Sequence, residues 1–192
     1  DFVRNYPRFV SAGYDIVASN KVGNTISYDF YASLRRLLKQ KGKTFLYETN
    51  VGAGLPLVDT IRQLHHSGDK IRRIRGVFSG TLSYIFNHFS EEDKDFYTIL
   101  REAMERGYTE PDPREDLCGN DVARKLLILA REIDLKSEFS DIAIENLIPE
   151  SLRTGSVEDF LSSGDYLNEY YAARKASLAP DEVLRYVGDL DA

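Results

Sequence analysis

The sequence has no tryptophan, one methionine and one cysteine, Cys118, among its 192 residues. A single cysteine excludes both a disulfide framework within the chain and a zinc site made of cysteines. Because this usage is typical of a reducing compartment, we expect a cytoplasmic protein. The sequence also lacks an apolar run of membrane-spanning length and a basic segment followed by an apolar one. We therefore expect no membrane partner.

Basic residues are outnumbered, since 25 Lys and Arg stand against 31 Asp and Glu and give a net charge of −6. The sequence has no basic stripe that would follow a phosphate backbone, which argues against nucleic acid as a partner. Hydrophobic residues make up 42% and aromatic residues 11%, enough to fill a core. The composition predicts a globular chain of one domain, or of one domain plus part of another.

Strands and helices alternate along the chain, which indicates an α+β or α/β fold. The most periodic segment predicts a helix from Asp121 to about Ile133, with Arg124 and Arg131 on its solvated side. Its core stripe consists of Val122, Leu126, Leu129 and Ile133. The other predicted helices cover 25–41, 56–67, 81–89, 96–106, 157–161 and 165–176. The predicted strands cover 14–19, 43–51, 71–78, 140–146 and 183–187.

Two glycine-containing turns each connect a strand to a helix. In "VGAGLP", residues 51–56, the third glycine of a GxGxxG motif would fall at Leu57, so this turn does not match a dinucleotide motif. Its glycines permit positive φ, and Glu48 with the free carbonyls of the turn would suit a hard cation. In "FSGTLSY", residues 78–84, exposed N–H groups and hydroxyls suit either a carboxylate ligand or an ordinary helix cap.

The stretch "GYTEPDPREDLCGNDVARK", residues 107–125, concentrates carboxylates around two prolines. Pro111 and Pro113 restrict φ on either side of Asp112, which stiffens the loop. On the helix that follows, Asp121 and Lys125 share one flank, where partial desolvation and nearby carboxylates would tune the lysine for proton transfer. The residues alone leave two interpretations open, a surface ion pair or a site for a small cation such as an amino acid's ammonium group.

This stretch, together with "TNVGAGLP" and "GVFSGTLSYIFN", resembles the catalytic region of homoserine dehydrogenase, and "VLRYVGDLD" is similar to the form fused behind an aspartokinase. The resemblance implies reduction of L-aspartate 4-semialdehyde to L-homoserine with NADPH or NADH, in threonine and methionine biosynthesis. It also implies a homodimer or higher homo-oligomer. Residues 1–46 would end a Rossmann domain, and residues 47–192 would form a catalytic and dimerisation domain with a mixed β-sheet covered by helices.

The resemblance also implies roles for single residues. Lys125 matches the lysine that transfers the proton. Lys21 matches a second lysine between cofactor and substrate, although it stands in "ASNKV" where the family usually has "TPNKK". The substrate's amino end would be held by Glu110 and Asp121, and its pocket lined by Tyr108 and Thr81. A sodium ion would be bound by Glu48, Val51, Ala53 and Leu55.

The family's GxGxxG motif has no counterpart in this sequence, so we expect the isolated chain to be inactive. Two alternatives remain. One is a non-catalytic domain that binds an amino acid or a cation through the carboxylate loop. The other is an aspartate-semialdehyde dehydrogenase, which the sequence disfavours because no histidine lies near Cys118 as a partner for a nucleophilic thiol.

Overall fold

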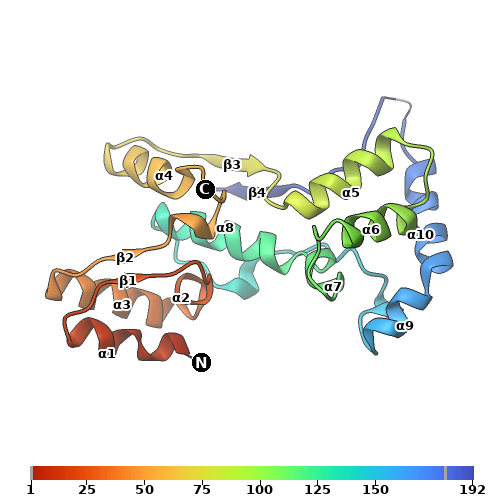
Figure 1. The fold of residues 1–192 in the computed structure, drawn as a ribbon. Helices are drawn as coiled ribbons and strands as arrows, with labels where there is room; N and C mark the ends of the chain where they lie inside the picture. The colour runs from red at the N-terminus through yellow and green to blue at the C-terminus, as the bar shows by residue number, and fades with distance from the viewer. Residues whose placement is uncertain (1, 180) are drawn as a thin grey trace. The chain divides into compact units, whose positions relative to one another are not determined.

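A computed structural model describes residues 2–179 and 181–192, and the chain divides into two compact units (Figure 1). Unit 1 comprises residues 2–78, 123–143 and 189–192. Unit 2 comprises residues 79–122, 144–179 and 181–188. Each unit has its own cluster of buried apolar side chains.

Unit 1 combines short strands with helices. Its elements are η1 (Phe2–Asn5), α1 (Tyr6–Ser11), β1 (Ile16–Val17), α2 (Val22–Thr25), α3 (Tyr28–Lys41), β2 (Phe45–Leu46), η2 (Glu48–Asn50), α4 (Leu57–His66), β3 (Arg73–Gly76) and η3 (Phe139–Asp141). It also holds most of α8 (Asn120–Glu132) and of β4 (Gly188–Asp191). Strands β1 and β2 are parallel, with Ile16 opposite Phe45, and β3 is hydrogen-bonded to β4.

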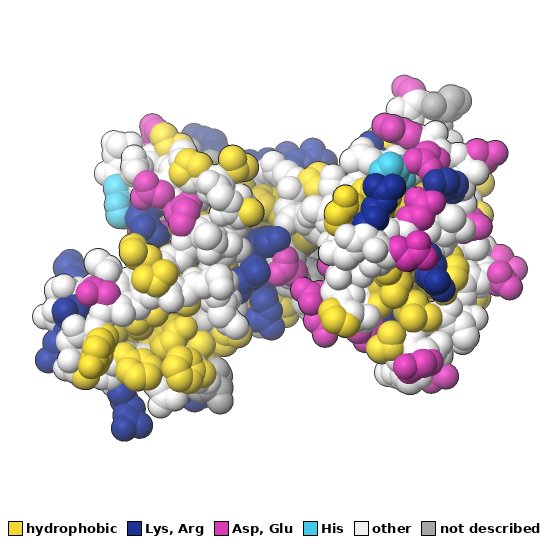
Figure 2. Space-filling model, in the orientation of Figure 1, with side chains coloured by type: hydrophobic (Ala, Val, Ile, Leu, Met, Phe, Trp, Pro, Cys, Tyr) yellow, Lys and Arg dark blue, Asp and Glu magenta, His cyan; other side chains and the backbone are white. Residues whose placement is uncertain are grey.

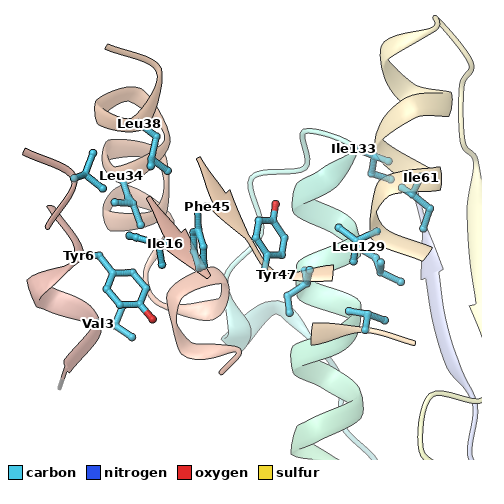
Figure 3. Packing of buried hydrophobic residues seen from close by; sticks show 14 residues of the cluster. Val3, Tyr6, Ile16, Leu34, Leu38, Phe45, Tyr47, Ile61, Leu129 and Ile133 are labelled. Atoms are coloured by element: carbon cyan, nitrogen blue, oxygen red, sulfur yellow. The ribbon is translucent and has the colours of Figure 1, made fainter. Parts of the chain in front are cut away.

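The core of unit 1 is built around aromatic rings and the apolar side chains of α8 (Figure 3). Tyr6 meets Phe45 edge to face with ring centroids 5.5 Å apart, and Phe45 lies 5.0 Å from Tyr47. Leu129 and Ile133 of α8 pack into the same cluster. Burying these side chains removes apolar surface from water, which is the main stabilising term for such a core.

Unit 2 is helical. Its elements are α5 (Gly80–Glu91), α6 (Phe96–Glu105), α7 (Arg114–Leu117), η4 (Glu150–Leu152), α9 (Val157–Ser162) and α10 (Gly164–Ala176). Phe96 of α6 stacks on Tyr171 of α10, with centroids 3.6 Å apart and planes 9° from parallel. Gly164 allows α10 to approach Tyr97, since an added Cβ would lie 2.5 Å from that ring. This close packing gives the carboxylate loop a rigid base.

The α+β class and the predicted helices are confirmed, whereas two predicted strands are wrong. Residues 140–146 contain the end of η3 and irregular chain, and residues 183–187 contain no strand, because β4 begins only at Gly188. The strands that do form are shorter than predicted, and in the described part of the chain they make two two-stranded sheets. The prediction that Arg131 faces solvent is also wrong, since its side chain is buried.

Candidate active site

The carboxylate loop begins where α6 ends. Gly107 has φ +69°, and its N–H donates to the carbonyl of Met104 at 2.9 Å. The N–H of Tyr108 donates to the carbonyl of Ala103, also at 2.9 Å. These two bonds satisfy carbonyls that the helix end leaves open, and the positive φ that they require favours glycine. The loop therefore leaves α6 in a fixed direction.

Asp112 is neutralised inside the loop. Its carboxylate accepts bonds from the Arg114 side chain at 2.7 to 3.1 Å and from the Arg114 N–H at 3.0 Å. These Arg114 hydrogen bonds hold the pKa of Asp112 below its usual range. Arg114 also donates to the carbonyl of Gly155 at 3.1 Å and lies over the Phe160 ring. Asp112 thus fastens the loop to the rest of unit 2.

Asp116 positions the backbone of Glu110. Its Oδ2 accepts a hydrogen bond from the Glu110 N–H at 2.8 Å, while the Glu110 side chain is exposed. Asp112 and Asp116 were not predicted to have a role of their own. For Asp112 a signal was present, because an aspartate two residues before the N–H that it binds is the usual spacing of an Asx turn. Asp116 bonds six residues back, which no local pattern indicates.

Thr81 and Tyr108, the two residues predicted to line the substrate pocket, are joined directly. Ser79 caps α5 by accepting from the Leu82 N–H at 3.2 Å, which places Thr81 in the first turn. The Thr81 hydroxyl donates to the carbonyl of Tyr108 at 2.6 Å. The Tyr108 side chain remains 49% exposed. The start of α5 and the start of the carboxylate loop therefore form one surface of unit 2.

The turn between α7 and α8 depends on Gly119. Its φ is +79°, and an added Cβ would lie 2.0 Å from the hydroxyl oxygen of Tyr186. That hydroxyl donates to the carbonyl of Glu145 at 3.0 Å. Asp121, in the first turn of α8, is exposed just after this turn. Gly119 and Tyr186 therefore fix how the chain passes from the loop into α8.

Asp121 and Lys125 both lie on α8, as predicted, but they belong to different units. Lys125 is half-buried in unit 1, and its Nζ donates to the carbonyl of Phe78 at 2.7 Å. A half-buried ammonium group fixed by a backbone carbonyl has less rotational freedom than a surface lysine.

Lys21, also in unit 1, immediately precedes α2 and is half-buried. The segment before it is held by the buried Asn50, whose side-chain amide donates to the carbonyls of Ala18 at 3.1 Å and Ser19 at 2.8 Å. Asn24 donates in turn to the Asn50 side-chain oxygen at 2.9 Å. Neither asparagine was predicted to position Lys21, because only the fold brings these distant residues together.

The predicted sodium turn has Gly52 at φ +82° and Ala53 at φ +53°. The Glu48 carboxylate accepts bonds from the N–H groups of Val58 at 2.9 Å and Asp59 at 3.0 Å, so it caps α4. Each carboxylate oxygen accepts about two bonds, which leaves acceptor capacity for a cation beside the turn. Among the described residues no three His, Cys, Asp or Glu side chains form a metal-binding group. A cation here would therefore depend on backbone carbonyls, and this all-oxygen donor set fits a hard ion such as sodium.

Comparison with known proteins identifies the family. The sequence model named Homoserine dehydrogenase matches residues 56–191. The chain is 46% identical over 190 residues to the chloroplastic bifunctional aspartokinase/homoserine dehydrogenase 2 of Zea mays, covering 98% of this chain and 21% of the relative. This chain belongs to the homoserine dehydrogenase family. It spans about a fifth of the length of the curated relatives that it matches.

Solved structures agree with this family. A putative homoserine dehydrogenase from Archaeoglobus fulgidus superposes with a TM-score of 0.74 at 28% identity, covering 98% of this chain and 52% of that one. A hyperthermophilic archaeal homoserine dehydrogenase in complex with NADPH has a TM-score of 0.60 at 28% identity and covers 68% of this chain and 40% of that one. No helix in the described residues is both long and apolar enough to cross a bilayer.

Proposed function

We propose that the protein containing this chain is a homoserine dehydrogenase that reversibly reduces L-aspartate 4-semialdehyde to L-homoserine. The main support from the structure is the rigid carboxylate loop of unit 2, in which Asp116 holds the Glu110 backbone and Thr81 holds Tyr108. Such a loop presents exposed carboxylates, which suit an amino acid's ammonium group, beside hydroxyl-bearing side chains. Family membership supplies the reaction.

In this proposal a nicotinamide cofactor, NADP or NAD, supplies the hydride when it is bound. Glu110 and Asp121 bind the ammonium group of the substrate and orient it, and Tyr108 and Thr81 shape the pocket. As the aldehyde is reduced, negative charge grows on its oxygen and a proton must reach it. Lys125, or a water that it holds, gives this proton. Lys21 would contribute positive charge between the cofactor and the substrate.

Further parts of the proposal concern partners. The NADPH complex of the archaeal relative supports a nicotinamide cofactor, and the oxygen-rich turn at Glu48 would bind sodium through Val51, Ala53 and Leu55. The maize relative supports fusion to an aspartokinase. Assembly as a homodimer or a higher homo-oligomer and a cytoplasmic location stay predictions, and the maize relative is named as chloroplastic.

The test is Lys125→Ala in the complete enzyme. If Lys125 transfers or relays the proton, turnover should fall by about 10²- to 10⁴-fold, the usual span for losing a general acid or base. Lys136→Ala, which removes an exposed lysine from the same unit, is the control and should leave turnover unchanged. If the Lys125→Ala enzyme keeps near-normal turnover at saturating substrate and an unchanged pH profile, Lys125 does not transfer the proton.

Glu110→Ala tests the binding role separately. Because the ammonium group is present in the ground state and the transition state alike, its loss should raise the apparent KM for homoserine more than it lowers kcat. A variant with unchanged KM would show that Glu110 does not bind the substrate.

A further inference from the structure

Unit 1 contains a cavity of about 350 Å³ that none of the candidate active-site residues lines. One wall is a single face of α3, and the others come from β2, from α4 and from the C-terminal end of α8. Its volume lies within the range of about 300 to 1,000 Å³ that is typical of small-molecule sites. Five Lys or Arg side chains and two carboxylates line it.

Arg35 is the central cation of this cavity. Its guanidinium lies 4.7 Å from the ring centroids of both Tyr31 and Tyr47, and 5.1 Å from that of Phe45. Its Nη2 donates to the Asn24 side-chain oxygen at 2.6 Å, and within the described chain it makes no ion pair with a carboxylate. Stacking on aromatic faces fixes the planar guanidinium without cancelling its charge. The remaining N–H groups of this fork are suited to a phosphate or a carboxylate.

Both carboxylates of the cavity already have partners. Glu132, which is 8% exposed, accepts bonds from the Tyr47 hydroxyl and from Arg62 Nε, the latter at 2.9 Å. Burial raises the pKa of Tyr47, so its hydroxyl stays protonated and remains a donor. Asp134 is paired with His65 at 3.0 Å. The lining still holds three more cationic side chains than carboxylates, so its net charge is positive.

The rim adds two lysines. Lys39 lies one helical turn beyond Arg35 on the same face of α3, and it is exposed. Lys43 follows the end of α3 and approaches Asp15 only at 3.9 Å. A concave surface with this excess of positive charge attracts anions, even though the whole chain carries −6.

We propose that this cavity binds a small organic polyanion with at least two anionic groups, phosphate or carboxylate. The guanidinium of Arg35 binds one anionic group of the ligand. The side chains of Lys39 and Lys43 bind the other. The site lies within unit 1 and uses no residue assigned to homoserine, so it stands apart from the proposed catalytic function.

The test is isothermal titration calorimetry of the 192-residue chain with inorganic pyrophosphate and, separately, with citrate, at constant ionic strength. Both probes carry several negative charges, whereas inorganic phosphate supplies only one group and should bind more weakly than either. Binding of pyrophosphate alone would identify a phosphate ligand, and binding of citrate alone a polycarboxylate. Absence of binding by both would overturn the proposal.

The site is assigned by a charge-matched pair of variants. Lys39→Gln/Lys43→Gln should weaken binding by about twofold to thirtyfold, the span expected for losing two partly exposed charge contacts. Lys41→Gln/Lys70→Gln removes the same charge from exposed positions of unit 1 outside the cavity and should leave the affinity unchanged. Equal affinities in the two double variants would mean that the anion binds elsewhere and would refute the assignment. Because the readout is binding, the result is independent of dehydrogenase activity.

Discussion

At the scale of single residues, four of the carboxylates in residues 107–125 fall into two groups. Asp112 and Asp116 accept hydrogen bonds from within the loop, whereas Glu110 and Asp121 are exposed. The sequence alone could not separate the two groups, because all four residues carry a carboxylate and lie within residues 110–121. A stiff loop needs the first group so that the second is presented in one arrangement.

Gly119→Ala should destabilise the chain more than a glycine substitution usually does. The new Cβ would require positive φ of a non-glycine residue and would also lie 2.0 Å from the Tyr186 hydroxyl oxygen. Left-handed backbone in a non-glycine residue costs about 1 to 2 kcal/mol and overpacking about 1 to 3 kcal/mol, so the free energy of unfolding should fall by about 2 to 5 kcal/mol. Urea unfolding followed by circular dichroism measures this change.

Gly107→Ala is the matched control for strain alone. Gly107 lies in the same unit at φ +69°, with nothing within 4 Å of an added Cβ, so it should cost only about 1 to 2 kcal/mol. In a Tyr186→Ala background, Gly119→Ala should cost less, although an added Cβ would still lie 3.0 Å from Ile144 Cγ2. If its cost does not change in that background, the contact with Tyr186 does not set the requirement for glycine.

At the scale of secondary structure, helices were predicted better than strands because their signals are local. Gly42 was predicted to stop the helix that ends at Lys41, and it does so at φ +60°. A strand instead needs a partner, and the partner of β3 is β4, which lies more than a hundred residues further along the chain. Exposure alternates along residues 141–146, with Ile142 and Ile144 half-buried between exposed neighbours, yet no strand forms there. Alternating exposure shows only that one side of the segment is covered. An irregular segment can show this pattern as well as a strand can.

Helix α8 illustrates a second limit. The predicted stripe of Val122, Leu126, Leu129 and Ile133 is buried, but so is Arg131 on the side expected to face solvent. Its guanidinium donates to the carbonyls of Asn24 and Ile26, both at 2.8 Å. The helical period gives the direction of each side chain, whereas only the fold determines that α2 and the segment after α8 cover this side.

The N-cap of α6 provides a test at this scale. Asp95 Oδ1 accepts a hydrogen bond from the Thr98 N–H at 2.7 Å, and α6 contributes Phe96 to the core of unit 2. Asp95→Ala should lower the free energy of unfolding by about 1 kcal/mol, while Asp95→Asn should retain most of it, since asparagine also caps helices. Asp93→Ala, at an exposed position just before the cap, is the control and should be nearly neutral. Equal stability of Asp95→Ala and the control would exclude a capping role.

At the scale of the whole molecule, the two compact units do not follow the boundary at residue 46 that the family resemblance implies. Tyr47 and Val51 share a core with Phe45, so unit 1 continues past it. The Rossmann boundary therefore stays a prediction. Long motifs were sufficient to predict the family, which is confirmed. The roles of the site residues stay predictions, because Lys21 and Lys125 belong to unit 1 and the four predicted substrate-binding residues belong to unit 2.

Unit 1 also exposes apolar side chains around its N-terminal elements, where hydrophobic side chains gather in Figure 2. Tyr14 is 64% exposed, Val17 79% and Leu46 57%, so both strands of the parallel pair present an uncovered apolar residue. Uncovered apolar surface beside a short two-stranded sheet is typical of surfaces that contact other protein.

The last prediction concerns what the 192 residues can do alone. Oxidation of homoserine needs the nicotinamide held against the substrate, and its pyrophosphate is normally bound by a glycine-rich turn at a helix N-terminus. The GxGxxG motif is absent from this sequence, and the glycine turn before α4 has Glu48 bound to the first N–H groups that a phosphate would use. The isolated chain should therefore show negligible reduction of NADP by homoserine, measured by absorbance, while the complete enzyme is active under the same conditions. Robust turnover by the purified chain would contradict this prediction. It would mean that residues of this chain other than Lys21 bind the nucleotide.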